Sequence, residues 1–310
     1  MIVITTPAGD IGARVLRRVL DAKRSTDTER GGSAEHGVRV IARHPSKLPD
    51  DVRDRVEIVE GSHAERVTID RALDGATAVF WLPPGSPTAP SAQEGYVAFS
   101  RAFTEALPSS SVRHVVGISA LGRGWPEPAG LVSASLAVDD LIGATGVHYR
   151  ALCCASLMDN IARQVEPIRE QGMFFAPTPG DLPLPHVAKR DVAEVAARLL
   201  LDRDWSSVEE VPLLGPEDVT HNEMAAIMSD VLGRPIAFGE MPMDQFEGML
   251  TAMGTSEGMV RDYALMMRAK NEGMDTMGRP DLDERSERHA LTPTTFRQWC
   301  EGELKPAVGV

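Results

Sequence analysis

The chain has 310 residues, 43% of them hydrophobic, and a formal net charge of −13. This is enough to bury a full core as one large domain or two smaller ones. Nucleic acid and anionic membranes are recognised by clustered Lys and Arg, so the negative charge argues against both as partners. No apolar stretch is long enough to span a bilayer, and the first residues show no charged-then-apolar leader, so we expect a cytoplasmic protein.

The cysteines and histidines do not indicate a metal site. Cys153, Cys154 and Cys300 lack a C-x-x-C spacing, and the eight histidines form no H-E-x-x-H pattern. Neither a disulfide framework nor a bound metal is expected.

The first twenty residues predict a dinucleotide-binding turn. Residues 2–4 form a short apolar strand, residues 5–12 a turn of small residues, and the following apolar positions mark one face of a helix. The usual motif at such a turn is G-x-x-G-x-x-G. Gly9 and Gly12 match its second and third glycines, and Thr6 stands at the position of the first. Such a turn presents free backbone N–H groups to a pyrophosphate, although an ordinary β–α turn remains the alternative. The predicted contacts are Thr6, Ala8, Gly9, Asp10, Ile11 and Gly12.

Strands and helices alternate through the rest of the first half. Residues 23–37 are polar and glycine-containing and are expected to form a surface insertion. Further strands are expected at 38–42, 56–59, 76–82, 112–118 and 147–152, with helices at 64–73 and 93–107. This order predicts parallel β–α–β units in an α/β, doubly wound Rossmann sheet, with the ligand across the carboxyl ends of its strands.

The second half is expected to add a smaller, mainly helical lid. We predict a dinucleotide-binding domain over 1–152, to which 186–215 returns, and a substrate-binding subdomain made of 153–185 and 216–310.

Local signals place several elements in this half. The returning segment contains a helix at 191–203 and a strand at 211–214. Thr220 and Glu223 predict a capping box, Gly233 a helix end, and Thr292 before Pro293 the start of a last helix.

Blocks of sequence along nearly the whole chain resemble the NmrA-like family of atypical short-chain dehydrogenases. They are TTPAGDIG at the start, VIARHPSKL at 40–48, VEIVEGS at 56–62, AVFWLPPG at 78–85, RHVVGISALG at 113–122, GVHYRALCCASLMDNI at 146–161, RDVAEVAARLL at 190–200 and LLGPEDVTHNEMAAIMSDVLGRPI at 213–236. The resemblance implies a Rossmann fold that binds NAD(P)(H).

Arg43 and Lys47 point to NADP(H) as the cofactor. An acidic residue after the second strand would bind the ribose hydroxyls of NAD, whereas Arg43 with Lys47 offers charge-assisted hydrogen bonds to a 2′-phosphate. Solvated surface charges are the alternative. The resemblance implies the same cofactor.

The resemblance also implies contacts at the ends of two further strands. Gly61 and Ser62 stand where relatives contact adenine, and Leu82, Pro83 and Pro84 stand near the nicotinamide ribose. The two prolines could equally be strand terminators.

The candidate catalytic residues are Ser119, Ser135 and Asn160. By resemblance, Ser119 would polarise a substrate carbonyl, although it could be a plain strand-end cap. Ordinary relatives carry Tyr-x-x-x-Lys on the next helix, but residues 133–140 contain neither, and Ser135 stands near the lysine position of a neighbouring branch. Asn160 resembles a family asparagine at the substrate entrance, or it caps a loop. Tyr149 is interpreted as a core aromatic instead of a displaced acid.

Two functions fit these features. The first is an NADPH-dependent oxidoreductase that transfers hydride to a small apolar carbonyl, quinone or enone. Such a reaction needs mainly orientation in a dry cleft. The second is a non-catalytic NADP(H)-sensing regulator read by a protein partner. Whether the protein is a homodimer stays open.

Overall fold

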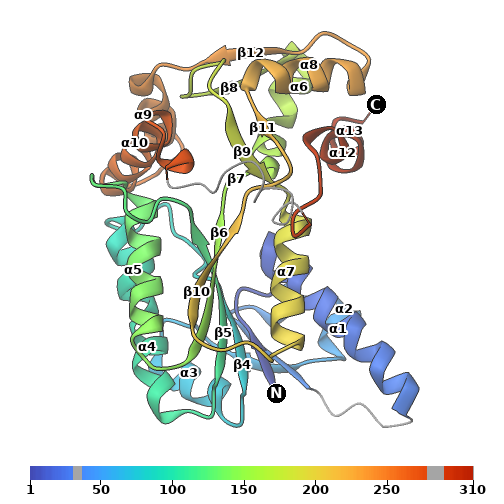
Figure 1. Cartoon of the computed structure of the whole chain (residues 1–310), viewed down its shortest axis with the longest axis vertical. Coiled ribbons are helices and arrows are strands. Elements are labelled where there is room, and N and C mark those ends of the chain that lie inside the picture. The colour runs from blue at the N-terminus through green and yellow to red at the C-terminus, as the bar shows by residue number, and fades with distance from the viewer. Residues whose placement is uncertain (31–36, 278–289, 310) are drawn as a thin grey trace.

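The computed structural model describes residues 1–30, 37–277 and 290–309, with side chains of 24–30 left out. Its centre is a parallel sheet in the order β10-β6-β5-β4-β1-β2-β3 (Figure 1). The strands are β1 (Ile2–Ile4), β2 (Val38–Ala42), β3 (Glu57–Glu60), β4 (Ala78–Trp81), β5 (His114–Ala120), β6 (His148–Cys154) and β10 (Val208–Leu213). The predicted doubly wound Rossmann sheet is confirmed, because β1 lies at the centre and the chain winds outward from it in both directions.

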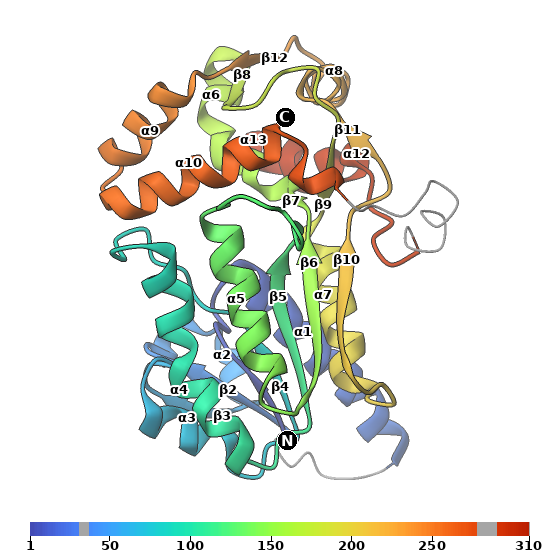
Figure 2. The same cartoon turned by 60° about the vertical axis from the view of Figure 1, so that its left-hand side comes forward.

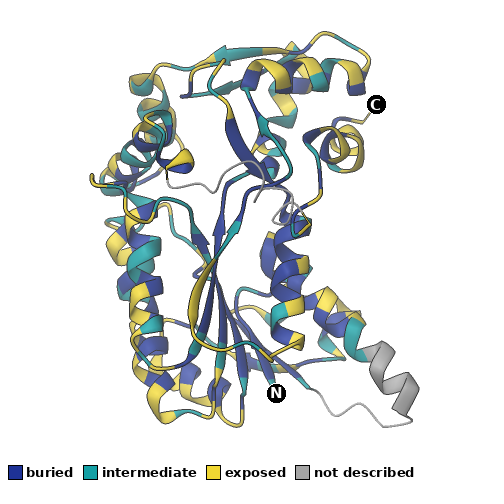
Figure 3. Cartoon of the chain, viewed as in Figure 1, coloured by how far each residue is buried: buried dark blue, intermediate teal, exposed yellow. Residues whose placement is uncertain are grey.

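Helices cover both faces of this sheet, as parallel β–α–β connections require. One face carries α1 (Asp10–Arg30), α2 (Asp50–Arg53) and α7 (Lys189–Leu201). The other carries α3 (Arg66–Leu73), α4 (Phe99–Ala106) and α5 (Leu131–Gly143), with a π-helical segment, Gln93–Ala98, leading into α4. Because both faces are covered, every residue of β1, β2 and β4 is buried (Figure 3).

Two local predictions are wrong. The segment 23–37 is not wholly an insertion, because α1 continues to Arg30. Polarity misled the prediction, because residues 22–30 contain neither Gly nor Pro to end the helix. Residues 31–36 of this segment lie outside the described residues. Thr292 does not cap a helix. Its buried hydroxyl accepts from the Gly215 amide at 3.0 Å, and Thr295 caps the next helix.

The described parts of residues 156–187 and 214–309 lie above the carboxyl ends of the large sheet, whereas α7 and β10 return to it (Figures 1 and 2). Two small sheets, β11-β9-β7 and β12-β8, were not predicted from sequence. Their strands are β7 (Ser156–Leu157), β8 (Met173–Ala176), β9 (Leu184–Val187), β11 (Asp218–Val219) and β12 (Ala237–Glu240). The helices here are α6 (Val165–Gln171), α8 (His221–Leu232), α9 (Met243–Ala252), α10 (Glu257–Asn271), α12 (Phe296–Trp299) and α13 (Lys305–Val308).

The capping box of α8 is confirmed. The Thr220 hydroxyl accepts from the Glu223 amide at 3.1 Å, and the Glu223 carboxylate accepts from the Thr220 amide at 2.8 Å. Gly233 ends the helix with φ 67°, a left-handed conformation that costs glycine little.

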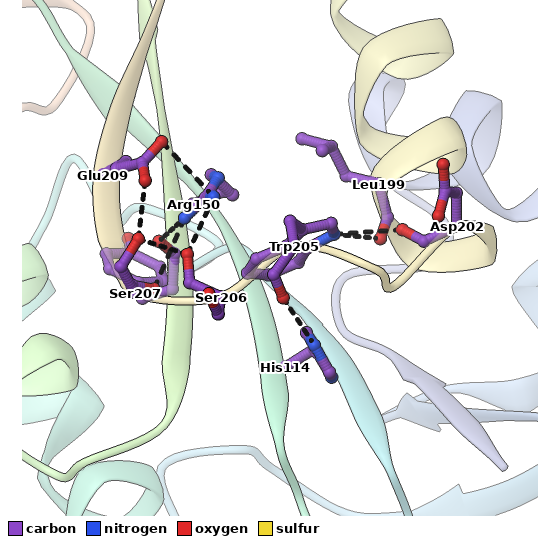
Figure 4. A network of polar contacts seen from close by, with 9 residues as sticks. His114, Arg150, Leu199, Asp202, Trp205, Ser206, Ser207 and Glu209 are labelled. Carbon is purple, nitrogen blue, oxygen red and sulfur yellow. Dashed lines mark hydrogen bonds and ion pairs between the residues drawn. The ribbon is translucent and has the colours of Figure 1, made fainter.

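A polar network fastens the edge strand β10 to the sheet (Figure 4). The guanidinium of Arg150 lies over the ring of Trp205 at 4.6 Å and donates to the Ser206 carbonyl at 2.9 Å. The Trp205 indole donates to the Leu199 carbonyl at the end of α7, and its own carbonyl accepts from His114. The connection from α7 to β10 is therefore anchored at the end of the sheet opposite the predicted ligand site.

Candidate coenzyme and active site

The direction of winding reverses between β1 and β4. From β1 the chain proceeds outward through β2 and β3, whereas β4 is followed by β5, β6 and β10 on the other side. Connections therefore leave the two central strands in opposite directions and open a crevice at their carboxyl ends, where open α/β sheets bind ligands.

Two threonines link the ends of β1 and β4 at this point. The Thr5 hydroxyl donates to the Phe80 carbonyl at 3.0 Å and accepts from the Leu82 amide at 2.8 Å. Thr6 has φ 52°, an uncommon conformation for a residue other than glycine, and donates its hydroxyl to the Leu82 carbonyl at 2.6 Å. These hydrogen bonds let Thr6 stand where the usual motif has its first glycine.

The next turn fits the backbone of a dinucleotide pyrophosphate. A Cβ added to Gly12 would lie 2.1 Å from the Thr6 carbonyl oxygen, and one added to Gly9 would lie 2.8 Å from the Thr6 methyl carbon. Only glycines allow the turn and α1 to pack this closely. The first i→i−4 bond of the helix runs from the Ala13 amide to the Gly9 carbonyl at 2.8 Å, so the amides of residues 10–12 point out of the helix end.

Asp10 brings a negative charge to the same helix end, where it is paired. The ammonium of Lys189, whose side chain is 7% exposed, donates to the Asp10 carboxylate at 2.7 Å. This hydrogen bond and the charge of Lys189 lower the pKa of Asp10. The Lys189 amide donates to Asp159 at 3.2 Å, which ties the pair to the second half of the chain. A paired carboxylate repels a neighbouring phosphate less than a free one.

The predicted ribose and adenine contacts follow neighbouring strands. Arg43 and Lys47 are exposed after β2, and Lys47 ends a single 3₁₀ turn, Pro45–Lys47. Gly61 and Ser62 are partly buried directly after β3. The pairing of β2 with β3 brings these four residues to one edge, so a ligand lying across it could meet all of them.

His63 belongs to the same region and was missed by the sequence analysis. Burial, followed by the charge of Arg43, lowers its pKa to about 4, so the ring is neutral at neutral pH. Because Thr6 gives its proton to Leu82, the His63 Nε2 atom, 3.2 Å away, is the donor in their contact. The signal for His63 was its place after a strand, next to Gly61 and Ser62.

At the expected nicotinamide end, Leu82 is partly buried, Pro83 is buried and Pro84 is exposed. Ser135 is half-buried on α5, and Asn160 is exposed in the 3₁₀ segment Met158–Gln164. Ser135 and Asn160 do not meet in a common hydrogen-bonded group.

Ser119 is held by a carboxylate that the sequence analysis missed. Its hydroxyl donates to Asp139 of α5, and the Tyr149 hydroxyl donates to the other oxygen of the same carboxylate at 2.5 Å. Asp139 follows Ser135 by four residues and precedes the buried Ile142 by three. An acidic residue on the apolar face of a helix was therefore the available signal.

Apolar side chains from both halves of the chain meet beside the end of β5. Met274 packs against Gly122 and Val132, and Ala120, Trp125 and Met266 pack against the same cluster. Close by, the Lys270 ammonium donates to Asp275 at 2.5 Å and to Ser156 at 3.4 Å. The second half of the chain therefore adds an apolar wall and a buried ion pair to this end of the sheet.

The fold and this crevice define a nucleotide-binding protein of the Rossmann class. The family model described as NAD(P)H-binding matches residues 8–203. A (4-alkanoyl-5-oxo-2,5-dihydrofuran-3-yl)methyl phosphate reductase of Streptomyces griseus is 30% identical over 254 residues, which is 81% of each chain. An NAD(P)H azoreductase of Xenophilus azovorans is 24% identical over 84% of this chain and 83% of its own.

A solved structure shows the same architecture. The NADPH-dependent quinone oxidoreductase of Escherichia coli superposes with a TM-score of 0.75 at 18% identity, covering 96% of this chain and 98% of that one. The chain belongs to the NAD(P)H-binding family. The predicted family and nicotinamide dinucleotide cofactor are confirmed, and the relatives support the prediction of an NAD(P)H-dependent oxidoreductase.

Across the ranges that the structure describes, no helix is long and apolar enough to cross a membrane. Within the same ranges, no three His, Cys, Asp or Glu residues are grouped so that they could hold a metal ion.

Proposed function

We propose that the protein is an NADPH-dependent reductase of a small apolar carbonyl, quinone or enone. The observation that carries the proposal is the crevice between β1 and β4, with a glycine cradle on one side and an apolar wall on the other. When bound, the reduced dinucleotide supplies a hydride. The residues of the chain bind it, orient the acceptor and exclude water.

The preference for NADPH over NADH rests on Arg43 and Lys47. Both side chains are exposed after β2, on the strand next to β1, and no acidic residue stands at either position. A guanidinium there would form charge-assisted hydrogen bonds with a 2′-phosphate, which NADH lacks.

An apolar acceptor is supported by the wall beside β5. Met266 and Met274 are unbranched and polarisable, so they can adapt to the shape of a flat ring. Of the two relatives described above, one is named an azoreductase and the other a reductase of a dihydrofuranyl-methyl phosphate, whose ring is accompanied by a charged phosphate.

The test is a calorimetric titration with NADPH and NADH, followed by an assay of NADPH consumption with quinones, enones and azo dyes. We expect tight NADPH binding and turnover of at least one class. Arg43→Ala should weaken NADPH selectively, whereas Arg101→Ala, an exposed arginine on α4, should change neither nucleotide. Equal affinity of the wild type for the two nucleotides would reject the NADPH preference.

The second candidate is a non-catalytic NADP(H)-sensing regulator. It is favoured by α5, which spans Leu131–Gly143 without the Tyr or Lys that ordinary relatives use for proton transfer. Tight nucleotide binding without turnover of any acceptor would favour it over the reductase.

A further inference from the structure

Three buried polar side chains form a closed group under the carboxyl end of β5. Ser119 of β5 and Tyr149 of β6 both donate their hydroxyls to the carboxylate of Asp139 on α5. Ser119 and Asp139 are each 5% exposed and Tyr149 is 1% exposed. Buried polar groups are ordinarily paired in this way, so pairing alone does not indicate a function.

The order of the group from the crevice inward is fixed by the topology. α5 begins after β5 and runs back along the sheet, so Ser135 lies one turn nearer the crevice than Asp139. Tyr149 stands near the start of β6, opposite Val115, and Ser119 stands opposite Cys153 near its end. Ser119 is therefore the member nearest the crevice, and Tyr149 is the deepest.

Asp139 can carry a proton in this position. Desolvation by burial raises its pKa to about 6, although the hydrogen bonds from Ser119 and Tyr149 act in the opposite direction. Arg123, in the loop after β5, lowers the pKa and Glu210 of β10 raises it. The other neighbours are the thiol of Cys153 and the hydroxyl of Tyr149, whose own pKa values burial raises.

Protonation changes the direction of the hydrogen bond to Ser119. A carboxylate can only accept, whereas a carboxylic acid also donates. Once Asp139 donates to the Ser119 oxygen, the Ser119 proton is free to turn toward the crevice. Tyr149 closes the inner end, so a proton can enter or leave the group only through Ser119.

We propose that Asp139 is the proton reservoir of the reaction and delivers its proton to the acceptor through Ser119. This inference rests on the proposed reductase function. Asp139, one turn beyond Ser135, would supply the proton that the Tyr-x-x-x-Lys pair supplies in ordinary short-chain dehydrogenases.

The acceptor gains a hydride and develops negative charge on oxygen, or on nitrogen in an azo compound. The Ser119 O–H bond breaks as the proton passes to that atom, and a new O–H bond forms with the proton of Asp139. Asp139 is left as a carboxylate and regains a proton from water through Ser119 after the product leaves. Asp139 therefore acts only through Ser119, and Ser119 is the group that touches the acceptor.

The test compares Asp139→Asn with Asp140→Asn, the exposed neighbouring carboxylate, in the whole chain. The profile of kcat/KM against pH is measured with NADPH and either 2-cyclohexenone or 1,4-naphthoquinone. Binding of NADPH is measured by calorimetry, and ionisation of Asp139 by NMR of carboxyl-labelled aspartate, which needs no turnover.

For the wild type we expect kcat/KM to fall as the pH rises through the ionisation of Asp139. Asp139→Asn should lower kcat/KM roughly 100-fold on the acid side and remove this dependence, with NADPH affinity unchanged. Asp140→Asn should keep the profile. Tyr149→Phe should move the midpoint upward by roughly one pH unit, because it removes a hydroxyl that stabilises the carboxylate. A merely structural role would lower activity evenly and move no midpoint.

Turnover by the wild type with an unchanged profile in Asp139→Asn would reject the relay and leave the reductase standing. An Asp139 that NMR shows ionised throughout would reject it as well. No turnover of either acceptor by the wild type would reject the relay together with the reduction of these acceptors.

Discussion

Replacing Asp139 by Asn should change how the stability of the protein depends on pH. An unperturbed aspartate titrates near pH 3.9, whereas burial raises the pKa of Asp139 to about 6. The folded state therefore holds this proton more tightly than the unfolded state. The contribution of Asp139 to the free energy of unfolding is greatest below about pH 4, falls as the pH rises through about 6, and is constant above. Two pKa units correspond to about 3 kcal/mol, and the side chain is buried enough for this conversion.

The assay is urea unfolding at intervals from about pH 4 to about pH 7.5, followed by circular dichroism. The unfolding free energy of the wild type minus that of Asp139→Asn should fall by about 2 kcal/mol over this range, because part of the full effect lies below pH 4. Asp140→Asn provides the matched control. Its side chain is 67% exposed, and the same subtraction should give a nearly flat curve. A flat curve for Asp139→Asn, or one that rises with pH, would refute the reasoning, because either requires an Asp139 that burial does not keep protonated.

Three further predictions concern the coenzyme crevice. Arg43→Ala should cost NADPH about 2 kcal/mol of binding free energy, roughly 30-fold, and NADH almost nothing, as calorimetry would show; equal losses would contradict the assigned contact. Gly12→Ala should abolish binding of both nucleotides, because its Cβ would lie 2.1 Å from the Thr6 carbonyl oxygen, whereas Gly248→Ala, with open space around it, should bind normally. Lys189→Met should weaken NADPH by about 1 kcal/mol, since the Asp10 carboxylate would lose its partner beside the phosphates; an unchanged affinity would place the phosphates elsewhere.

Local patterns were sufficient for the elements of the large sheet. β1, β2 and β4 are short runs, apolar except for Arg39, that are buried on both faces, and such runs can be recognised without knowledge of the partner strands. The capping box at Thr220 and Glu223 could also be recognised from the sequence, because both partners lie within one helical turn. Prediction failed at residues 23–30, where a helix has the polar composition of a loop.

The candidate site divides in the same way. The sequence by itself determined the glycine turn, the basic residues after the second strand and the absence of Tyr-x-x-x-Lys, since each is a matter of short spacing. Only the tertiary structure decided that Lys189 pairs with Asp10 and that His63 contacts Thr6. It also decided that Asp139 accepts hydrogen bonds from hydroxyl groups on two strands. The partners in these contacts are 179, 57 and up to 20 residues apart along the chain. Burial and charge at such contacts depend on which elements pack together, and this packing cannot be inferred from residues that are neighbours in the sequence.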